Sequence, residues 1–458
     1  MELTRHHREQ GLVVALLSLV LAALVYVGVS NLIEHAPFST GASTSTALNP
    51  AIAGEVRAFM NSGASREQAI ESFEVQGRFM QAHLVSKLES SMGRAYGGEW
   101  FDPSTGVMHV GGTSVASLRR AEAVASRAGL ASAVTETSVR SGWAKLESTL
   151  KRWNQRLAGL FAHNQLATYL SPQRNSLELE LASTVPVSTA AALRHKAAQA
   201  GVNVSVTNTS YPNLGIERQE SRCANFVSDK AYCDPTIVAG VTIRALGLAK
   251  CTAGPAALPA EGKSTATYVL TAGHCIKQFW GGNNVGVWTF EKTGSKEKLV
   301  GETVAAKNSN ADIGAILVEN PGFWVKEGKT PVNPAIAPWG SAEPQPFAVP
   351  GQMAPGVGNG ACMAGQTSGE KCGTISALNV TLNGVEELVE VEGAASAEGD
   401  SGAPWWSTQK ASLHWVLGTH VGKRISNGRP VFERLSFGLE QLRAEVDLKL
   451  LTTENETR

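Results

Sequence analysis

The sequence predicts a chain of three parts: an N-terminal apolar helix, a small α+β domain and a C-terminal all-β domain. Residues 11–33 contain no charged side chain, which is typical of a membrane-directed helix. Helical and strand patterns alternate between residues 51 and 215, a stretch without cysteine. All 6 cysteines lie between Cys223 and Cys372, and the 46 glycines of the chain favour a turn-rich all-β domain.

Composition limits the classes of protein that fit. At about 150 residues per domain, 458 residues correspond to two or three domains. The 40 basic residues balance the 40 acidic ones, so the chain lacks the basic excess of a typical nucleic-acid-binding protein. A hydrophobic content of 43% with only 17% charged residues predicts a folded chain rather than a disordered one. We expect no nucleic-acid partner.

Residues 1–33 are expected to form a signal anchor or a signal peptide. As a helix, residues 11–33 would span about 34 Å, enough for a hydrocarbon core of about 30 Å. Arg5 and Arg8 precede this stretch, so the positive-inside rule places the remainder of the chain outside the cytoplasm. The length favours an uncleaved anchor over a signal peptide, but both interpretations stay open. Residues 34–50 are rich in serine and threonine and are expected to form a flexible linker.

Residues 51–215 are predicted to form an α+β domain that contains a repeat. Residues 51–92 have helical spacing, and a further helix is expected at 143–160. The repeat runs strand, alanine-rich helix, glycine, strand. The first copy has strands within 97–110 and a helix over 114–127 that ends at Gly129. The second copy has a strand at 177–181, a helix at 188–200 that ends at Gly201, and a strand at 202–206. This region carries no metal-ligand spacing, phosphate loop or nucleophile motif.

Residues that support nucleophilic catalysis occur only after residue 220. His274 lies in Thr-Ala-Gly-His-Cys, Ser401 lies in Gly-Asp-Ser-Gly, and Asp312 precedes an apolar run between them. A serine hydroxyl is a weak nucleophile and needs an adjacent base, which His274 would supply. Asp312 would hold the imidazole in the required tautomer. The backbone N–H groups of Gly399 and Ser401 would form the oxyanion hole, because glycine allows the chain to turn one N–H inward.

Residues 223–447 resemble the bacterial serine proteases of the alpha-lytic protease and streptogrisin group. The resemblance rests on the triad motifs, on Cys251-Thr-Ala-Gly, on the segment from Cys362 to Cys372, and on the loop from Ala395 to Ser401. It implies a chymotrypsin-like fold of two packed six-stranded barrels over residues 220–447, with a polar tail at 448–458. Residues 51–215 resemble, more faintly, the pro-regions of that group, which act as intramolecular chaperones and inhibitors.

The resemblance also implies disulfide pairs. It supports Cys251–Cys275 and Cys362–Cys372, which leaves Cys223–Cys233 among the 15 pairings that six cysteines allow. A zinc site is the alternative, but the sequence contains no Cys-x₂-Cys pair. We therefore expect neither a metal nor another cofactor. Disulfides fit an extracytoplasmic location, either membrane-anchored or secreted.

The substrate pocket departs from the pattern of the group. Its expected residues are Ala395, Glu398, His420, Val421, Gly422 and Lys423. Ala395 stands where a trypsin-like pocket has an acidic residue, so we do not expect cleavage after lysine or arginine. His420 and Lys423 favour cleavage after glutamate or aspartate in one interpretation. In the other, His420 packs or faces solvent and the pocket accepts apolar side chains.

Three further differences concern the nucleophile loop and its wall. Ala403 stands where the group usually has glycine, and Ser396 stands where it often has cysteine. Val421-Gly422-Lys423 replaces the Ser-Gly-Gly segment of the group. Ile237-Val-Ala-Gly240 resembles the start of the mature trypsin barrel, whose freed amino terminus would pair with Asp400. In the streptogrisin-like interpretation the cut falls earlier, and Asp400 is expected to pair with a side chain.

The sequence thus predicts a serine endopeptidase that matures by self-cleavage between about residues 213 and 222. Its expected partners are a polypeptide substrate, its own pro-domain, and a membrane that residues 11–33 would enter. A catalytically silent binding or sensor protein is the alternative.

Overall fold

The computed structural model describes most of the chain after residue 47. The described residues are 48–209, 214–215, 237–245, 250–261, 266–277, 287–290, 298–319, 332–336, 347–349, 351–410, 413–453 and 455. The expected anchor within residues 1–33 lies outside this part, as do Cys223 and Cys233. Across the described ranges, no helix is both long enough and apolar enough to span a bilayer.

The described chain begins with the helices that the pattern over residues 51–92 predicts. They are α2 (Pro50–Asn61), α3 (Arg66–Gln81) and α4 (Leu84–Met92), followed by the short helix η1 (Gly93–Ala95). Ser65 and Gln68 form a capping box that fixes the start of α3. Phe59 and Phe79 pack on Phe101, with ring centroids 6.0 and 5.9 Å away. Helices α2 and α3 therefore bury apolar side chains against the strand that follows them.

The predicted repeat is present, and each copy has the same topology. The elements of the first copy are β1 (Tyr96–Asp102), β2 (Val107–Gly112), α5 (Val115–Arg127), η2 (Ala131–Ala133) and β3 (Val134–Ser138). Those of the second are β4 (Leu166–Ser171), β5 (Ser176–Ala182), α8 (Val187–Ala198) and β6 (Asn203–Thr209). In each copy an antiparallel hairpin is followed by a helix that crosses to a parallel strand. The expected helix at 143–160 is divided into α6 (Trp143–Arg156) and α7 (Ala158–Ala162).

The C-terminal region is β-rich, as expected. Its first sheet has 8 strands in the order β10-β9-β13-β14-β15-β12-β11-β24. Their bounds are β9 (Thr242–Ala245), β10 (Lys250–Thr252), β11 (Ala256–Pro259), β12 (Tyr268–Thr271), β13 (Val287–Phe290), β14 (Lys298–Lys307), β15 (Ile313–Val318) and β24 (Leu448–Leu450). Buried aliphatic residues such as Val241, Ile243 and Ile316 fill one core of this sheet.

A second group of strands closes on itself. These strands are β18 (Gly360–Gly365), β19 (Gly369–Leu382), β20 (Val385–Glu392), β21 (Pro404–Lys410), β22 (Leu413–Arg424) and β23 (Pro430–Arg434). They pair in the cycle β18-β19-β20-β23-β22-β21-β18, which makes a six-stranded barrel. Helix α11 (Leu435–Leu442) follows, and β7 (Leu214–Gly215), β8 (Ile237–Ala239), β16 (Val332–Ile336) and β17 (Phe347–Ala348) extend the sheet.

The end of the chain differs from the sequence prediction. The polar tail expected at 448–458 begins later, because β24 pairs antiparallel with β11. Leu448, Leu450 and Leu451 are buried in the core of the β-rich region, whereas Lys449 between them is exposed. The alternation of leucine and lysine is the period-2 pattern of an edge strand, and it was hidden by the polar residues that come after it.

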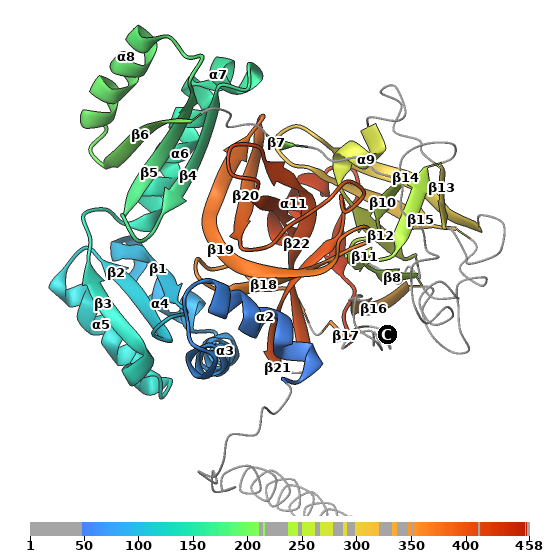
Figure 1. Ribbon diagram of the computed structural model, residues 1–458, viewed down its shortest axis with the longest axis horizontal. Coiled ribbons are helices and arrows are strands. Elements are labelled where there is room, and N and C mark those ends of the chain that lie inside the picture. Colours follow the sequence, from blue (N-terminus) through green and yellow to red (C-terminus); the bar gives the residue numbers. More distant parts are fainter. Residues whose placement is uncertain are drawn as a thin grey trace, which may run out of the picture. The chain divides into compact units, whose positions relative to one another are not determined.

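The N-terminal region and the six-stranded barrel, called the second barrel below, share one sheet. Strand β4 pairs antiparallel with β19, so β6, β5 and β4 continue the sheet beyond the barrel (Figure 1). Asn154 donates to Thr381 at 2.9 Å and accepts from Thr168 at 2.8 Å, which adds a buried polar link at this junction. Residues Asn49–Arg458 accordingly form one compact unit.

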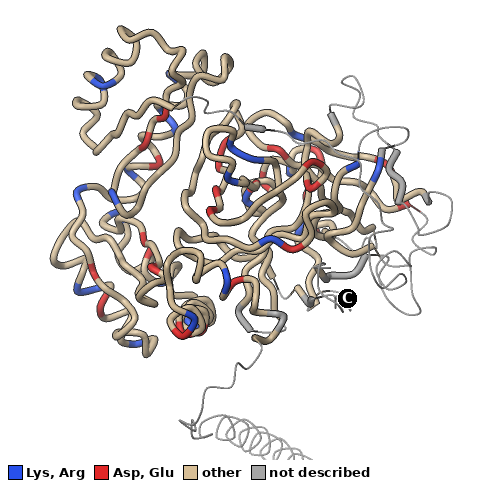
Figure 2. Tube along the Cα trace, viewed as in Figure 1, with Lys and Arg blue, Asp and Glu red and all other residues tan. Residues whose placement is uncertain are grey.

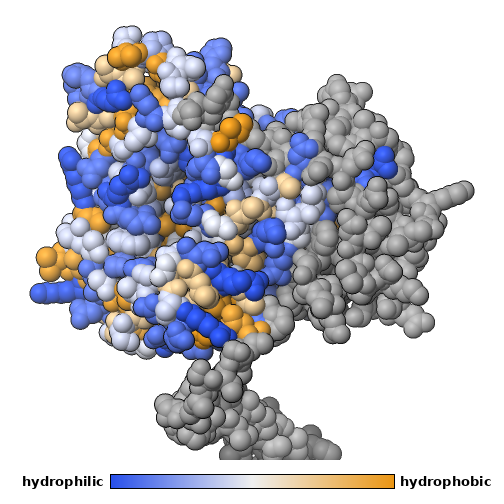
Figure 3. All heavy atoms as spheres, in the orientation of Figure 1, coloured by the Kyte–Doolittle hydropathy of each residue, from blue (hydrophilic) through white to orange (hydrophobic). Residues whose placement is uncertain are grey.

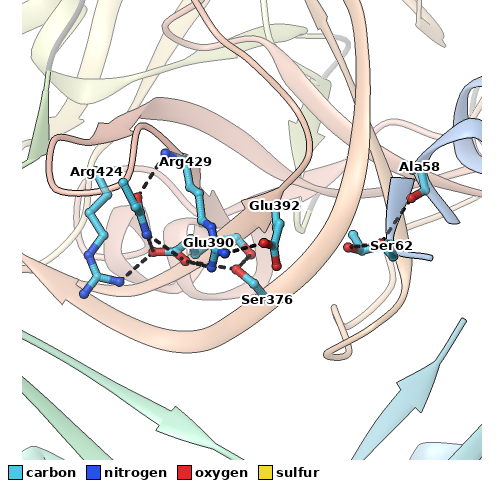
Figure 4. Close-up of polar contacts among 9 residues, drawn as sticks. Ala58, Ser62, Ser376, Glu390, Glu392, Arg424 and Arg429 are labelled. Carbon is cyan, nitrogen blue, oxygen red and sulfur yellow. Dashed lines mark hydrogen bonds and ion pairs between the residues drawn. The ribbon is translucent and has the colours of Figure 1, made fainter. Parts of the chain in front are cut away.

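Charged residues form a second link between the two regions. Arg424 on β22 pairs with Glu180 on β5 and with Glu390 on β20, the latter at 2.7 Å. Figure 4 shows Arg424 and Arg429 on either side of the Glu390 carboxylate. Burial alone would raise the pKa of Glu390, but the two guanidinium groups lower it. The network lines an open pocket of about 840 Å³ between the regions.

Charged and apolar residues are mixed on the described part of the surface. Figure 2 shows basic and acidic residues interspersed along the described trace. Figure 3 shows mainly hydrophilic residues on one face, with small apolar groups among them. The exposed large apolar side chains of the described part are Met60, Val115, Val187, Val304 and Ile425, which come from separate elements.

Glu55 of α2 is a buried carboxyl group at the contact with the barrel. The backbone N–H of Thr408 donates to its Oε1 at 2.5 Å, and the Gln76 amide donates to Oε2 at 3.3 Å. Burial raises the pKa of Glu55 to about 8, in spite of these donors. Between the ordinary value of 4.5 and about 8, the folded chain holds a proton that the unfolded chain releases. Folding stability is therefore present at low pH and declines as the pH rises through this window.

We expect Glu55→Gln to reduce this pH dependence, because glutamine keeps an acceptor for Thr408 and cannot ionise. Urea unfolding at pH 5 and pH 8, in a Ser401→Ala background that prevents self-cleavage, measures the effect. Between pH 5 and pH 8, the free energy of unfolding should fall more for the protein with Glu55 than for the Glu55→Gln variant. Glu74→Gln, at an exposed position of α3, is the matched control and should leave the dependence unchanged. An identical pH dependence in the Glu55→Gln and control variants would contradict the prediction.

Candidate active site

The three residues of the predicted triad come from both parts of the β-rich region. His274 lies in the short helix α9 (Gly273–Lys277) directly after β12, and Asp312 directly precedes β15. Because β12 and β15 pair antiparallel, with Thr271 opposite Gly314, these two residues lie next to each other. Ser401 precedes β21 of the second barrel. The site therefore forms where the first sheet meets the barrel.

The side chains form one hydrogen-bonded line. Ser401 Oγ lies 2.9 Å from His274 Nε2, and His274 Nδ1 lies 2.6 Å from Asp312 Oδ2. The backbone N–H of His274 donates to the other oxygen of Asp312 at 2.7 Å. All three residues are at least 95% buried, with exposures of 5% for His274, 2% for Asp312 and 3% for Ser401. This geometry allows a proton to pass from the serine hydroxyl to the imidazole.

The loop before Ser401 has a backbone conformation that requires glycine. Gly399 has a φ of +93°, and a Cβ at this position would lie 2.0 Å from Gln366 Nε2. The Thr367 hydroxyl donates to the carbonyl of Glu398 at 2.6 Å. In a trans peptide the C=O and N–H point in opposite directions, so the Gly399 N–H points away from Thr367. Within the described part of the chain, the N–H groups of Gly399 and Ser401 have no hydrogen-bond acceptor.

Thr252 is a residue of this site that the sequence analysis did not identify. It belongs to the Cys251-Thr-Ala-Gly segment, and its hydroxyl donates to the carbonyl of Gly399 at 2.8 Å. Its backbone N–H donates to the carbonyl of Ser401, also at 2.8 Å. The hydroxyl accepts in turn from the Gln366 N–H at 3.2 Å. Its place directly after Cys251 was the available signal, because the disulfide of that cysteine fixes β10 beside His274.

Asp400 is held by more than the side-chain partner that one interpretation of the sequence predicts. A side-chain partner was expected, but its carboxylate accepts mainly backbone N–H groups, from Thr367 at 2.9 Å, Ser368 at 3.0 Å and Ala397 at 2.8 Å. The Ser368 hydroxyl adds a further hydrogen bond. Burial raises the pKa of Asp400, and these donors act in the opposite direction. Two of these backbone donors come from the turn between β18 and β19 and one comes from the nucleophile loop itself, so no charged partner is needed.

The β-rich region contains two disulfides among the described residues. Cys251–Cys275 joins β10 to α9 next to His274, and Cys362–Cys372 joins β18 to β19. A search of the described residues for groups able to hold a metal finds Cys362, Glu370 and Cys372. Two of these three are joined in the disulfide, and a disulfide sulfur is not the thiolate that a metal site requires. The pair Cys223–Cys233 remains a prediction.

The departures in the nucleophile loop leave the site geometry intact. The side chain of Ala403 is fully buried and packs in the core of the barrel with Val357 and Leu417. Its N–H donates to the carbonyl of Asp400 at 2.8 Å, which closes a turn around Ser401. Ser396 Oγ is buried and has no hydrogen-bond partner in the part of the chain that the structure describes.

The predicted pocket residues have different environments. Ala395 is exposed, and Glu398 and Lys423 are half-buried. Val421 is fully buried in a core cluster with Val380 and Val431, so its side chain is occupied by packing. His420 is also buried, and its backbone pairs with Gly402 and Ala403 beside Ser401.

The protonation state of His420 follows from its surroundings. The indole N–H of Trp405 donates to Nδ1 of His420 at 3.3 Å, which leaves the proton of the neutral ring on Nε2. Burial, with smaller contributions from the nearby His274 and Lys423, lowers the pKa of His420 to about 3. His420 is therefore a neutral hydrogen-bond donor next to the triad.

A segment of the N-terminal region pairs with the expected pocket wall. Strand β7 lies antiparallel to the end of β22, with Leu214 opposite Arg424 and Gly215 opposite Lys423. The same strand β22 reaches the nucleophile loop at His420, whose carbonyl accepts from the Gly402 N–H at 2.8 Å. A peptide segment that pairs with this edge of β22 in the way that β7 does therefore runs antiparallel to β22.

Comparison with known proteins finds similar structures over part of the chain. The chain is similar to protease A of Thermobifida fusca (22% identity, TM-score 0.35), covering 47% of this chain and 99% of that one. It is similar to a glutamic acid specific serine protease and to an alpha-lytic protease homologue, each at 23% identity and a TM-score of 0.35, over 47% of this chain and 100% of the other. No protein-family model matches the chain. The similarity to the alpha-lytic protease group that the motifs indicate is found in these comparisons.

We expect Gly399→Ala to destabilise the fold more than Gly393→Ala. Both glycines have a positive φ, +93° and +82°, which costs an alanine about 1–2 kcal/mol. At Gly393 the nearest atom to an added Cβ lies 3.9 Å away, whereas at Gly399 it lies 2.0 Å away. The overlap should add about 1–3 kcal/mol. Urea unfolding in the Ser401→Ala background gives both values, and equal losses would show that the loop has room for a side chain.

Proposed function

We propose that this chain is a serine endopeptidase that cleaves peptide bonds through an acyl-enzyme. The observation that carries the proposal is the buried line Ser401–His274–Asp312, with distances of 2.9 and 2.6 Å. Ser401 Oγ attacks the scissile carbonyl carbon while His274 Nε2 takes its proton. His274 then returns that proton to the leaving amine, and the acyl-enzyme forms. Water, deprotonated by the same imidazole, hydrolyses the ester and regenerates Ser401.

The backbone around Ser401 stabilises the charge that this reaction creates. The carbonyl oxygen of the substrate becomes an oxyanion in the tetrahedral intermediate, and the unpaired N–H groups of Gly399 and Ser401 are its donors. One such donor contributes about 3–4 kcal/mol to the transition state. Asp312 stabilises the imidazolium and holds its ring through Nδ1. Each group is fixed before the substrate arrives, so little reorganisation is needed during the reaction.

We also propose that residues 51–215 are a pro-domain that inhibits the protease until the chain is cut. The pairing of β7 with Lys423 and Arg424 supports this, because it occupies the edge that a substrate would use. The β4–β19 pairing supports a role in folding, since it supplies a template strand to the barrel. The expected cut between residues 213 and 222 lies largely outside the described residues.

The location that fits this function is extracytoplasmic. The two disulfides support it, because such bonds persist mainly in oxidising compartments. Residues 11–33 would deliver the chain there as an anchor or a cleaved signal.

The alternative is a silent protein that uses the fold for binding or sensing. A silent site does not require a serine within hydrogen-bonding distance of a histidine, nor two free N–H groups beside it. These features favour the enzyme.

Self-processing tests the proposal directly. The full chain, produced in an oxidising compartment, should accumulate as a fragment whose new N-terminus lies between residues 213 and 222. Ser401→Ala should accumulate uncut, because loss of the nucleophile lowers kcat by about 10⁶-fold. Intact mass and N-terminal sequencing measure both, and a serine-reactive phosphonate should label only the wild type.

Each other outcome has a defined meaning. A wild-type chain that is neither cut nor labelled would overturn the proposal and favour the binding protein. A wild type that is labelled but uncut would support the protease and overturn removal of the pro-domain. Cleavage of both chains at the same bond would mean that another protease performs the maturation.

Substrate preference is a second test. We expect peptides with glutamate before the scissile bond to be cut at least about 10-fold faster than those with phenylalanine. The neutral donor His420 and the cation Lys423 both favour a carboxylate, and His420→Phe should remove most of the preference. Thr419→Val, at the buried position before His420, is the control and should retain it. Faster cleavage after phenylalanine by the wild type would instead assign His420 to packing.

A further inference from the structure

A second carboxyl group lies directly behind Asp312. Glu433, on β23, is fully buried, and its Oε2 accepts the backbone N–H of Asp312 at 2.8 Å. The carboxylate of Asp312 in turn accepts the backbone N–H and the Nδ1–H of His274. Glu433 comes from the second barrel and Asp312 from the first sheet, so this hydrogen bond fixes one part of the site to the other.

The neighbours of Glu433 supply no positive charge. Thr419 on β22 and Leu388 on β20 are its cross-strand neighbours, and Gly438 of α11 lies against its side chain. Asp312, before β15, is the charged group that faces it. No basic side chain in the described ranges forms an ion pair with Glu433. Burial and the charge of Asp312 raise the pKa of Glu433 well above its ordinary value, whereas the Asp312 N–H acts in the opposite direction.

An uncharged acid suits this position better than a carboxylate. Two adjacent buried carboxylates repel each other, so one of them retains its proton. A charged Glu433 would add to the negative potential at His274 and raise the pKa of the imidazole. A neutral Glu433 still accepts the Asp312 N–H through its carbonyl oxygen. The remaining oxygen, Oε1, has no hydrogen-bond partner among the described residues.

We propose that Glu433 is a positioning residue of the triad, an uncharged carboxylic acid that fixes the main chain of Asp312. The inference rests on the proposed function. Asp312 stands at the start of a strand, where its N–H has no strand partner and needs another acceptor. A misplacement of about 1 Å at a triad residue costs about 10²-fold in rate. Glu433 acts through Asp312 and does not touch the substrate.

Two substitutions in the full chain separate charge from hydrogen bonding. Glu433→Gln keeps an acceptor and is always neutral, so kcat should stay within about threefold of wild type. The acid limb of the pH–rate profile, which reports His274, should not move. Glu433→Leu removes the acceptor and should lower kcat by about 10- to 100-fold with KM nearly unchanged. Thr419→Val, opposite Glu433 in the barrel, is the matched control and should leave kcat and the profile unchanged.

An NMR signal distinguishes a positioning residue from one that only stabilises the fold. The proton between His274 Nδ1 and Asp312 should give a downfield NMR resonance, unchanged in Glu433→Gln and shifted or broadened in Glu433→Leu. Equal unfolding midpoints would show that the variants are folded. If Glu433→Leu does not fold, Glu433→Gln still decides, because the proposal requires its kcat, acid limb and resonance to match the wild type.

Three results would overturn the inference. They are a folded Glu433→Leu variant with wild-type kcat, a Glu433→Gln variant whose acid limb moves to lower pH, and a Glu433→Gln variant that loses tenfold or more in kcat. Failure of the proposed function is distinguishable, since a folded wild type would then be as inactive as Ser401→Ala. In that case the NMR resonance alone tests whether Glu433 positions Asp312.

Discussion

The hydrogen bonds of Thr252 join the first sheet to the nucleophile loop, and the geometry of the site depends on them. Asp312 and His274 belong to the first sheet, whereas Ser401 belongs to the barrel. The backbone of Thr252 holds the carbonyl of Ser401, and its hydroxyl holds that of Gly399. The backbones meet so closely that a Cβ at Gly402 would lie 2.4 Å from the Thr252 carbonyl. The Ser401–His274 distance is thus set by backbone contacts rather than by flexible side chains.

The contact of the N-terminal region with the barrel contains buried polar groups beside apolar ones such as Ala167. Glu55, Gln76 and Asn154 are buried there and find their donors or acceptors across the contact, at Thr408, Ser407 and Thr381. Such groups exchange one hydrogen bond for another with water when the contact opens, so the net loss per bond is only about 1 kcal/mol. An apolar contact of the same area would resist separation more strongly. These polar contacts are compatible with the proposed pro-domain, which would fold with the protease and later leave it.

Features that depend on local sequence could be predicted, whereas long-range pairing could not. The helices, the repeated hairpin–helix–strand unit and the motifs around His274 and Ser401 each rest on a short stretch with its own periodicity or turn residues. The pairing of β4 with β19 and the place of β24 depend on which edges are open in the folded chain. Glu433 is 121 residues from Asp312 and occurs in a strand without a catalytic motif. Its role becomes visible only when the barrel brings it behind the triad.

Three acidic residues lie buried around Ser401, and each is accommodated differently. Asp312 receives two N–H groups of His274, so its charge is used at the imidazole. Asp400 is surrounded by backbone N–H groups of its own loop and of the turn between β18 and β19, which carry no net charge. Glu433 has one donor and an unpartnered oxygen, a set that satisfies a neutral acid better than an anion. In the proposed reaction, confining the negative charge to Asp312 would direct the field toward His274, whose imidazolium forms when Ser401 loses its proton and lasts until that proton reaches the leaving amine.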